Sequence, residues 1–125
     1  MKQNSFRDLE AYKEGKKLVK EVYNLLKKFP KEEQYAMCDQ LSRAAISITS
    51  NIAEGSGRAS FKEKIHFVEI SYGSLMEVLS QMDIACDLKY INEQEFNNIE
   101  VMVENVARPL SGLKNYFTRQ ANSNL

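Results

Sequence analysis

Apolar residues recur along the chain at spacings of three and four, the pattern of amphipathic helices. Four such segments, separated by short turns, predict helices over about residues 6–28, 31–55, 61–88 and 93–119. Because connections this short favour antiparallel neighbours, the pattern predicts an all-α, up-down-up-down four-helix bundle. We expect residues 1–125 to form a single domain of this kind.

Two signals are expected to end the first two helices. Phe29-Pro30 closes the first helix, because a proline disfavours the α conformation in the residue before it. Gly55 and Gly57 are expected to stop the second helix by adopting left-handed or extended conformations. Gly55-Ser56-Gly57-Arg58 also resembles a phosphate loop, but it lacks a preceding strand and the Gly-Lys-Ser/Thr ending. We therefore interpret it as a helix stop.

The starts of the third and fourth helices carry capping boxes. In Ser60/Glu63 and in Asn92/Glu95, a short polar side chain is followed three residues later by a glutamate. Pro109 lies inside the apolar pattern of the fourth helix, where it cannot donate a main-chain hydrogen bond. The sequence predicts a kink or a break there.

One apolar line on each helix predicts the core, except that the third helix has two lines. The lines of the other helices are formed by Ala11, Leu18, Val22, Leu25 and Phe29, by Leu41, Ala45, Ile48 and Ile52, and by Phe96, Ile99, Val103, Val106, Leu110, Leu113 and Phe117. The two lines of the third helix lie about 180° apart at about 100° per residue. They comprise Phe61, Ile65, Val68, Tyr72, Leu75, Leu79, Met82 and Cys86, and Phe67, Ile70, Val78, Ile84 and Leu88.

The second line of the third helix has no place in a bundle with one interior. Five apolar residues on one outer line predict a subunit interface, and hence a homo-oligomer. The alternative is that they are scattered surface residues, which are common in soluble proteins. Gly73, in the middle of the same helix, suggests close approach by a neighbouring element, because glycine lowers helix stability.

Charge is balanced over the chain but uneven along it. Lysine plus arginine and aspartate plus glutamate number 17 each, whereas residues 1–29 hold eight basic and four acidic residues. A stripe of lysines on the first helix, opposite its apolar line, is a candidate nucleic-acid-binding face: Lys13, Lys16, Lys17, Lys20 and Lys27. Such a stripe neutralises phosphates without reading sequence. The alternative is a solvated face, and no aromatic residue interleaves on the same line to support base stacking.

A row of polar residues borders the apolar line of the second helix: Gln40, Arg43, Ser47, Asn51 and Glu54. Half-buried polar groups must find partners. A hairpin that turns near Gly57 predicts an Arg43–Glu69 pair, and Asn51, Glu54 and Arg58 are expected to satisfy the turn. The row is interpreted as a structural network, with a ligand or partner surface as the alternative.

Catalytic and metal chemistry find little support in the sequence. His66 is the single histidine, so Glu63-x-x-His66 supplies only half of a di-iron motif, and we expect no metal and no cofactor. No serine has a histidine placed beside it to act as a base, so we expect no enzyme. Cys38 and Cys86 are interpreted as reduced core residues. No apolar run is long enough to span a membrane, and we expect a cytoplasmic protein.

Several of these segments together resemble a known family. They are Phe6-Arg7-Asp8-Leu9, Phe29-Pro30, Glu33-x-Tyr35, Gln40-Leu41-x-Arg43-Ala44-Ala45, Ser47-Ile48, Ser50-Asn51-Ile52-Ala53-Glu54-Gly55, Arg58 and Gly73-Ser74-Leu75 with Glu77. They are similar to four-helix-bundle proteins of the 23S rRNA intervening-sequence type, once described as S23 ribosomal proteins. Ser42 and Thr49 depart from this pattern, at positions where the family usually has arginine and proline.

The resemblance implies a bundle that assembles as a ring-like homopentamer. The same family includes accessory proteins of diversity-generating retroelements, which are basic rings that bind nucleic acid and a reverse transcriptase. Two functions from different classes follow as expectations. The first is a non-enzymatic, oligomeric scaffold associated with RNA or a nucleic-acid-processing protein through the lysine stripe. The alternative is a protein-binding adaptor that uses the ring surface and binds no nucleic acid.

Overall fold

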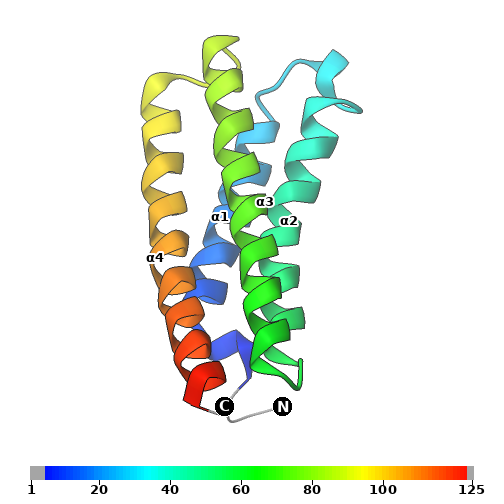
Figure 1. Cartoon of the computed structure of the whole chain (residues 1–125). Helices are drawn as coiled ribbons and strands as arrows, with labels where there is room; N and C mark the ends of the chain where they lie inside the picture. Colours follow the sequence, from blue (N-terminus) through cyan, green and yellow to red (C-terminus); the bar gives the residue numbers. More distant parts are fainter. Residues whose placement is uncertain (1–4, 124–125) are drawn as a thin grey trace.

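The computed structural model describes residues 5–123, so the ends of the predicted domain, 1–4 and 124–125, lie outside the described residues. It contains α1 (Glu10–Leu26), α2 (Met37–Ser56), α3 (Phe61–Asp87) and α4 (Glu93–Ser123), with 3₁₀-helices η1 (Phe6–Asp8) and η2 (Lys31–Glu33). The colours in Figure 1 follow the chain up α1, down α2, up α3 and down α4. The prediction of an all-α fold with four helices is confirmed, and residues 5–123 contain no strand.

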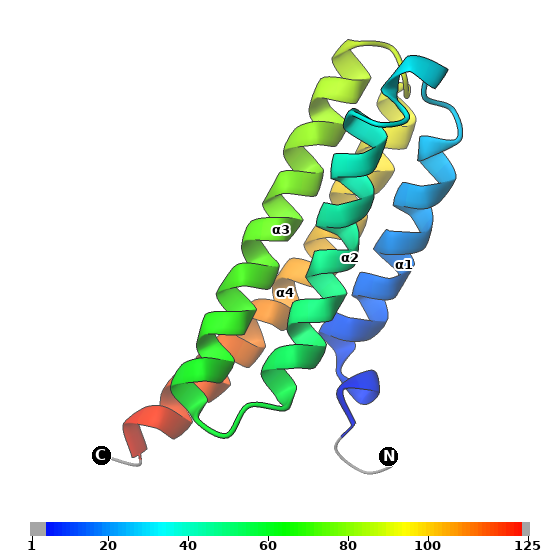
Figure 2. The ribbon, with the colours of Figure 1, turned by 90° about the vertical axis from the view of Figure 1, so that its right-hand side faces the viewer.

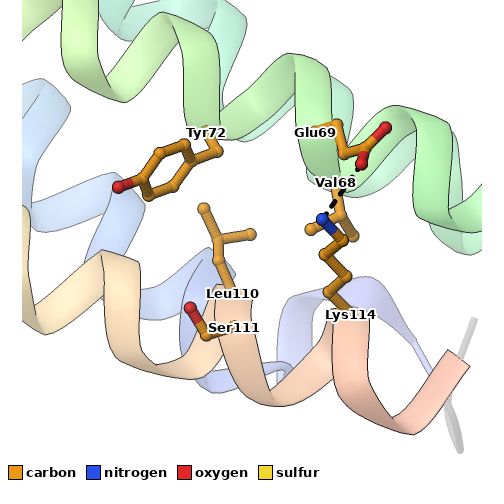
Figure 3. Close-up of a pocket in the computed structure, with 6 residues that line it drawn as sticks. All are labelled: Val68, Glu69, Tyr72, Leu110, Ser111 and Lys114. Carbon is orange, nitrogen blue, oxygen red and sulfur yellow. Dashed lines mark ion pairs between the residues drawn. The ribbon is translucent and has the colours of Figure 1, made fainter. Parts of the chain in front are cut away.

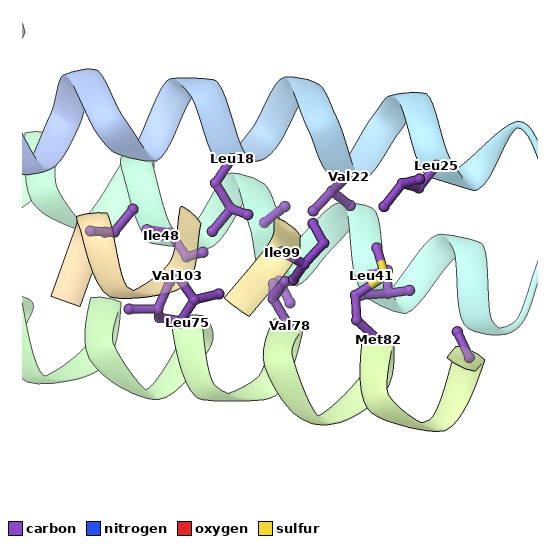
Figure 4. Packing of buried hydrophobic residues seen from close by; sticks show 14 of the residues in the cluster. Leu18, Val22, Leu25, Leu41, Ile48, Leu75, Val78, Met82, Ile99 and Val103 are labelled. Carbon is purple, nitrogen blue, oxygen red and sulfur yellow. The ribbon is translucent and has the colours of Figure 1, made fainter. Parts of the chain in front are cut away.

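Each helix packs against two others, so the four enclose one interior. α1 and α3 both contact α2 and α4. Figure 2 shows α3, α2 and α1 side by side on one face, with α4 behind them. The interior is filled mainly by the predicted lines, and Figure 4 shows side chains from all four helices meeting there. Tyr72, predicted in the inner line of α3, is instead 44% exposed, so its place in the core line is wrong. Leu18, Ile48, Leu75 and Ile99 are fully buried, and each such side chain contributes roughly 1.5–3 kcal/mol by leaving water.

The first two α-helices begin later than predicted, because short capped segments precede them. The Ser5 hydroxyl accepts from the Arg7 main-chain N–H at 3.1 Å and so caps the start of η1. Leu9, which follows η1, is extended with ψ of 134°. In the second case Pro30 is extended and starts η2. Ala36 is not helical (φ −119°, ψ −96°), so α2 starts at Met37.

The predicted capping box is complete at the start of α4, whereas at the start of α3 only its serine bond is found among the described residues. Ser60 Oγ accepts from the Glu63 main-chain N–H at 3.1 Å. At α4 the box is reciprocal: the Glu95 main-chain N–H donates to Asn92 Oδ1 at 2.8 Å, and the Asn92 main-chain N–H donates to Glu95 Oε1 at 2.9 Å. These bonds satisfy main-chain N–H groups that a helix start leaves unpaired.

The glycines at the end of α2 act differently from the prediction. No glycine of the described residues has a positive φ, and Gly57 is nearly helical at φ −90° and ψ −3°. Gly55 instead allows close helix packing, because a Cβ on it would lie 2.8 Å from the Cβ of Phe67 on α3. The predicted left-handed or extended stop is therefore wrong, and Gly55 is required by packing.

Pro109 does not break the fourth helix, which runs continuously from Glu93 to Ser123. The carbonyl of Asn105, four residues earlier, loses its usual partner because proline has no N–H. Asn105 is exposed, so water can satisfy that carbonyl. The exposure of Asn105 explains why the helix tolerates a proline at position 109.

Hydrogen bonds fix the register of α2 against α3. Ser71 Oγ donates to the main-chain oxygen of Ile48 at 2.8 Å, and Ser74 Oγ donates to Ser47 Oγ at 2.8 Å. Towards the other end, Gln81 Nε2 lies 3.4 Å from Gln40 Oε1. As positions rise along α2, their partners fall along α3, so these two helices run in opposite directions.

Candidate nucleic-acid interface

The five predicted lysines lie on the side of α1 that faces away from the core. Four of them are exposed and Lys16 is half-buried. Lys17 Nζ is 3.0 Å from Glu14 Oε2, and Lys16 Nζ lies 5.4 Å from the centre of the Tyr12 ring. Within residues 5–123 the other three form no ion pair: Lys13, Lys20 and Lys27. Three exposed amines on one helix face are therefore available to an anionic partner.

Two open hollows adjoin on the surface between α1 and α2, and Tyr23 and Ile46 line both of them. We call this surface the Tyr23 groove. One hollow, of about 450 Å³, is also lined by Lys20 and Lys27, and the other, of about 440 Å³, by Arg43. No aspartate or glutamate lines either hollow. The groove therefore joins apolar and aromatic surface to three cationic side chains.

Tyr23 is the residue that the sequence analysis missed. It follows Lys20 by three positions and precedes Lys27 by four, so it lies next to the lysine stripe on the helix surface. Its side chain is 46% exposed, and that of Ile46 is 43% exposed. An aromatic residue does therefore accompany the lysines, and the three- and four-residue spacing was the signal for it.

Arg43 does not pair with Glu69, so that prediction is wrong. Arg43 Nε instead lies 3.3 Å from a carboxylate oxygen of Asp39, one turn earlier on α2. Glu69 pairs with Lys114 on α4, at 3.0 Å between Nζ and Oε2. The α2–α3 register places Arg43 about two helical turns from the level expected for a hairpin that turns at Gly57.

The remaining polar residues form small separate groups instead of one network. Asn51 Nδ2 donates to the Ser47 main-chain oxygen at 2.8 Å and to its hydroxyl at 2.9 Å. At the end of α2, Arg58 Nη2 lies 2.6 Å from Glu54 Oε2, and its guanidinium lies over the Phe67 ring at 4.7 Å. These contacts tie α2 to its own turn and to α3.

A second group lies at the other end of the α2–α3 contact. Gln81 Nε2 donates to Glu77 Oε2 at 3.1 Å and faces Gln40 Oε1. Gln81 Oε1 is buried and has no hydrogen-bond partner among the described residues. Gln40 and Glu77 are exposed, so this group is a surface link between two helices.

The outer line of α3 is only partly at the surface. Ile70, Ile84 and Leu88 are 37%, 47% and 49% exposed. Val78 is 0% exposed, because it projects into the core with Leu75 and Met82, so its assignment to a subunit interface is wrong (Figure 4). Phe67 is half-buried against Gly55 and Arg58. The candidate interface therefore reduces to Ile70, Ile84 and Leu88, with Phe67 at its edge.

Gly73 lies in open space on this chain, and a Cβ added to it would meet nothing within 4 Å. The predicted close neighbour is absent from the described residues. Gly73 and Ile70 are both exposed and three positions apart, so they share a helix face. The glycine leaves a shallow gap on the candidate interface.

A further hollow, of about 340 Å³, lies between α3 and α4 (Figure 3). Tyr72, Val68 and Glu69 reach it from α3, and Leu110, Ser111 and Lys114 from α4. The Glu69–Lys114 ion pair crosses it. Its two charges neutralise each other, whereas no carboxylate of the described residues lines the Tyr23 groove.

Histidine, cysteine, aspartate and glutamate side chains do not gather into a metal site in residues 5–123. No group of three or more histidine, cysteine, aspartate or glutamate side chains could hold a metal within residues 5–123. Both cysteines are free and half-buried. Burial is the main cause that raises the pKa of Cys38, and the negative charge of Glu33 adds to it. Burial is also the main cause that raises the pKa of Cys86, and the negative charge of Glu93 is the next. Raised pKa values keep both thiols protonated and weakly nucleophilic.

The fold and this surface define an all-α four-helix protein with a basic, aromatic groove. The family model of the 23S rRNA-intervening sequence protein matches residues 7–112, and the chain belongs to this family. The match covers α1, α2, α3 and most of α4, including the Tyr23 groove. No curated protein matches the chain. No helix in the described part is long and apolar enough to cross a membrane.

Proposed function

We propose that this protein is a non-enzymatic RNA-associated bundle that works as a homo-oligomer, and that the outer face of α1 contacts the phosphates. The observation that carries the proposal is the concentration of unpaired positive charge on one surface of a chain with no net charge. Lys13, Lys20 and Lys27 have no acidic partner among the described residues, and the adjoining groove is lined by no carboxylate. The family's description names an rRNA segment, which supports RNA as the polyanion.

Filter binding with a structured RNA at about 50 mM and about 200 mM salt tests this proposal. Each phosphate contact contributes about 0.7–0.9 to the slope of log affinity against log salt. Changing both Lys20 and Lys27 to glutamine is therefore expected to lower the slope by about 1.4–1.8. Lys62→Gln, at an exposed lysine of α3, is the matched control and leaves the slope unchanged. Absence of binding at low salt, or binding that ignores salt, contradicts the proposal.

The outer line of α3 supports self-association. Three large apolar side chains stand exposed along one helix face, and Gly73 leaves room beside them for close approach by another chain. Burying such a face between copies removes apolar surface from water. The ring of five copies, with neighbouring helices antiparallel in each, is the assembly expected from the family resemblance.

Light scattering tests this assembly. A pentamer has five times the 14.4 kDa mass of the chain. Ile84→Asp places a charge in the candidate interface and is expected to give the monomer mass. Val101→Asp is the control, because Val101 is 59% exposed on α4 and outside that face. A wild-type monomer contradicts the assignment.

A protein-binding adaptor is the second candidate function. The same three exposed apolar side chains of α3 favour it, since they would also suit a different protein as partner. A monomeric wild type that binds no RNA at low salt, yet loses a protein partner in Ile84→Asp, would favour the adaptor. Retention of that partner by Ile84→Asp would contradict the role of this face.

A further inference from the structure

The Tyr23 groove combines three features that a basic surface for phosphates does not need. Tyr23 is 46% exposed, Ile46 beside it is 43% exposed, and both line two adjoining hollows. Apolar area left open to water favours an occupant with a flat apolar face. A phosphate backbone has no such face, whereas a nucleobase does.

The charges around the groove favour a nucleotide over an apolar ligand. Lys20 and Lys27 lie on either side of Tyr23 along α1, and Arg43 borders the second hollow from α2. Neither lysine is paired within residues 5–123, and the one ion pair of Arg43, to Asp39, lies at the exposed surface. A base against Tyr23 would therefore have cations within reach of the phosphates on both its sides.

We propose that Tyr23 is a stacking platform for an unpaired base of single-stranded or looped RNA, with Lys20, Lys27 and Arg43 holding the flanking phosphates. This inference rests on the proposed RNA-binding function and names the form of RNA that the groove takes. A base inside a duplex is covered by its neighbours on both faces, so only an unstacked base can lie on the ring. The platform is sequence-tolerant, because every base has a π-face.

Two polar side chains of the groove already donate to atoms of α2 itself. The Asn51 side-chain nitrogen donates to Ser47, so it is not free to donate to a base edge. Ser42 Oγ donates to the Asp39 main-chain oxygen at 3.0 Å. Binding in the groove is therefore assigned to stacking on Tyr23 and to the charges of Lys20, Lys27 and Arg43.

Tryptophan fluorescence provides the first test, because the chain contains no tryptophan. Tyr23→Trp introduces a single reporter that keeps a flat ring at the platform. A single-stranded oligonucleotide of roughly ten nucleotides, within the usual site size, is expected to quench it, whereas a blunt duplex of the same length is not. Tyr116→Trp is the matched control, because Tyr116 is 47% exposed on α4, and its fluorescence should not respond. Equal quenching by the duplex overturns the inference.

Affinity measurements separate this inference from the proposed function. Tyr23→Ala is expected to weaken binding of the single strand roughly five- to 150-fold, which corresponds to about 1–3 kcal/mol of stacking. Tyr23→Phe keeps the ring and should bind like the wild type. If Tyr23→Ala binds normally while the Lys20/Lys27 double variant is weakened, the platform is wrong and the phosphate contacts stand. If the wild type binds no RNA at low salt, both proposals fall.

Discussion

The hydroxyl of Ser71 donates to the main-chain oxygen of Ile48 at 2.8 Å, and both residues are 0% exposed. This bond crosses from α3 to α2 inside the core, where water cannot replace it. It sets the level at which the two helices meet. Its neighbour on the same pair of helices, Ser74 to Ser47, continues the polar seam to the surface.

Ser71→Ala is expected to lower the free energy of unfolding by about 0.5–1.5 kcal/mol, the usual net contribution of one hydrogen bond. The Ile48 carbonyl keeps its bond within α2, so no buried acceptor is left without a partner. Urea unfolding measures the change. Ser80→Ala, at an exposed position of α3, is the control for the higher helix propensity of alanine and should raise the free energy of unfolding by about 0.5 kcal/mol at most. A stability equal to the wild type would show that the Ser71 bond contributes nothing.

The register between α2 and α3 marks the limit of the sequence prediction. Apolar periodicity identified the four helices and most of their buried positions, because core burial imposes that period on each helix separately. Register depends on where the hairpin turns. With Gly57 taken as the turn, Arg43 was matched to Glu69, whereas the observed turn follows Ser56 and precedes Phe61. An error of a few residues in the position of the turn shifts the predicted partner on α3 by twice that number of residues.

Gly55 and Gly73 are expected to respond in opposite directions to the same change. In Gly55→Ala the new methyl group would lie 2.8 Å from Phe67 Cβ, which cannot rotate away, so α2 and α3 must separate. We expect a loss of about 1–3 kcal/mol in the free energy of unfolding. Gly73→Ala meets nothing within 4 Å and should raise the stability of the isolated chain by about 0.5–1 kcal/mol.

Thermal unfolding of the two glycine variants at the same protein concentration distinguishes them. The two variants add the same methyl group, so each is the control for the other. A tolerated Gly55→Ala would contradict the close contact with Phe67. A Gly73→Ala variant that loses the oligomer, measured by light scattering, would place Gly73 inside the subunit interface.

Glu95 is expected to make the free energy of unfolding depend on pH in the acid range. Two hydrogen bonds hold the pKa of its carboxyl below the ordinary value of 4.5: the bond donated by Lys28 has the larger effect, and the bond donated by the Asn92 main-chain N–H has the smaller one. Because the folded-state pKa is lowered, the stabilisation is present above the ordinary value and is lost as pH falls through the folded value. Glu95→Gln should therefore be less stable at pH 7 and lose less stability on acidification.

Urea midpoints from pH 7 down to about pH 3 measure this dependence. Glu100→Gln serves as the control, because Glu100 is exposed on α4 and forms no ion pair within residues 5–123. Its acid limb should match that of the wild type. Parallel acid limbs for Glu95→Gln and the wild type would contradict the role of the Lys28–Glu95 pair.

The sequence predicted the positive charge of the candidate site but not the groove beside it. The lysine stripe follows from helix periodicity alone, because all five residues lie on one helix. The Tyr23 groove needs Ile46 and Arg43 from a second helix, and their level depends on how α1 packs on α2. The two apolar lines of α3 show the same limit, since Val78 proved to face the core.

Replacing Gln81 is expected to stabilise the fold, because the oxygen of its side-chain amide is buried without a hydrogen bond among the described residues. Its Oε1 has no partner among the described residues, while its Nε2 donates to Glu77 and lies near Gln40. An unsatisfied buried acceptor costs about 1–3 kcal/mol, and a typical hydrogen bond returns about 1 kcal/mol. Both partners are exposed, so water can replace the amide. Gln81→Met, which is similar in length, should therefore raise the free energy of unfolding by roughly 1 kcal/mol.

Gln81→Glu is the opposing variant, because it places a second negative charge beside Glu77 and removes the donor. It should lower the free energy of unfolding at neutral pH. Gln94→Met, at an exposed position of α4, controls for the effect of methionine itself and should change little. Urea unfolding of the three variants gives the comparison. A less stable Gln81→Met would show that the two bonds donated by Gln81 outweigh the cost of its buried oxygen.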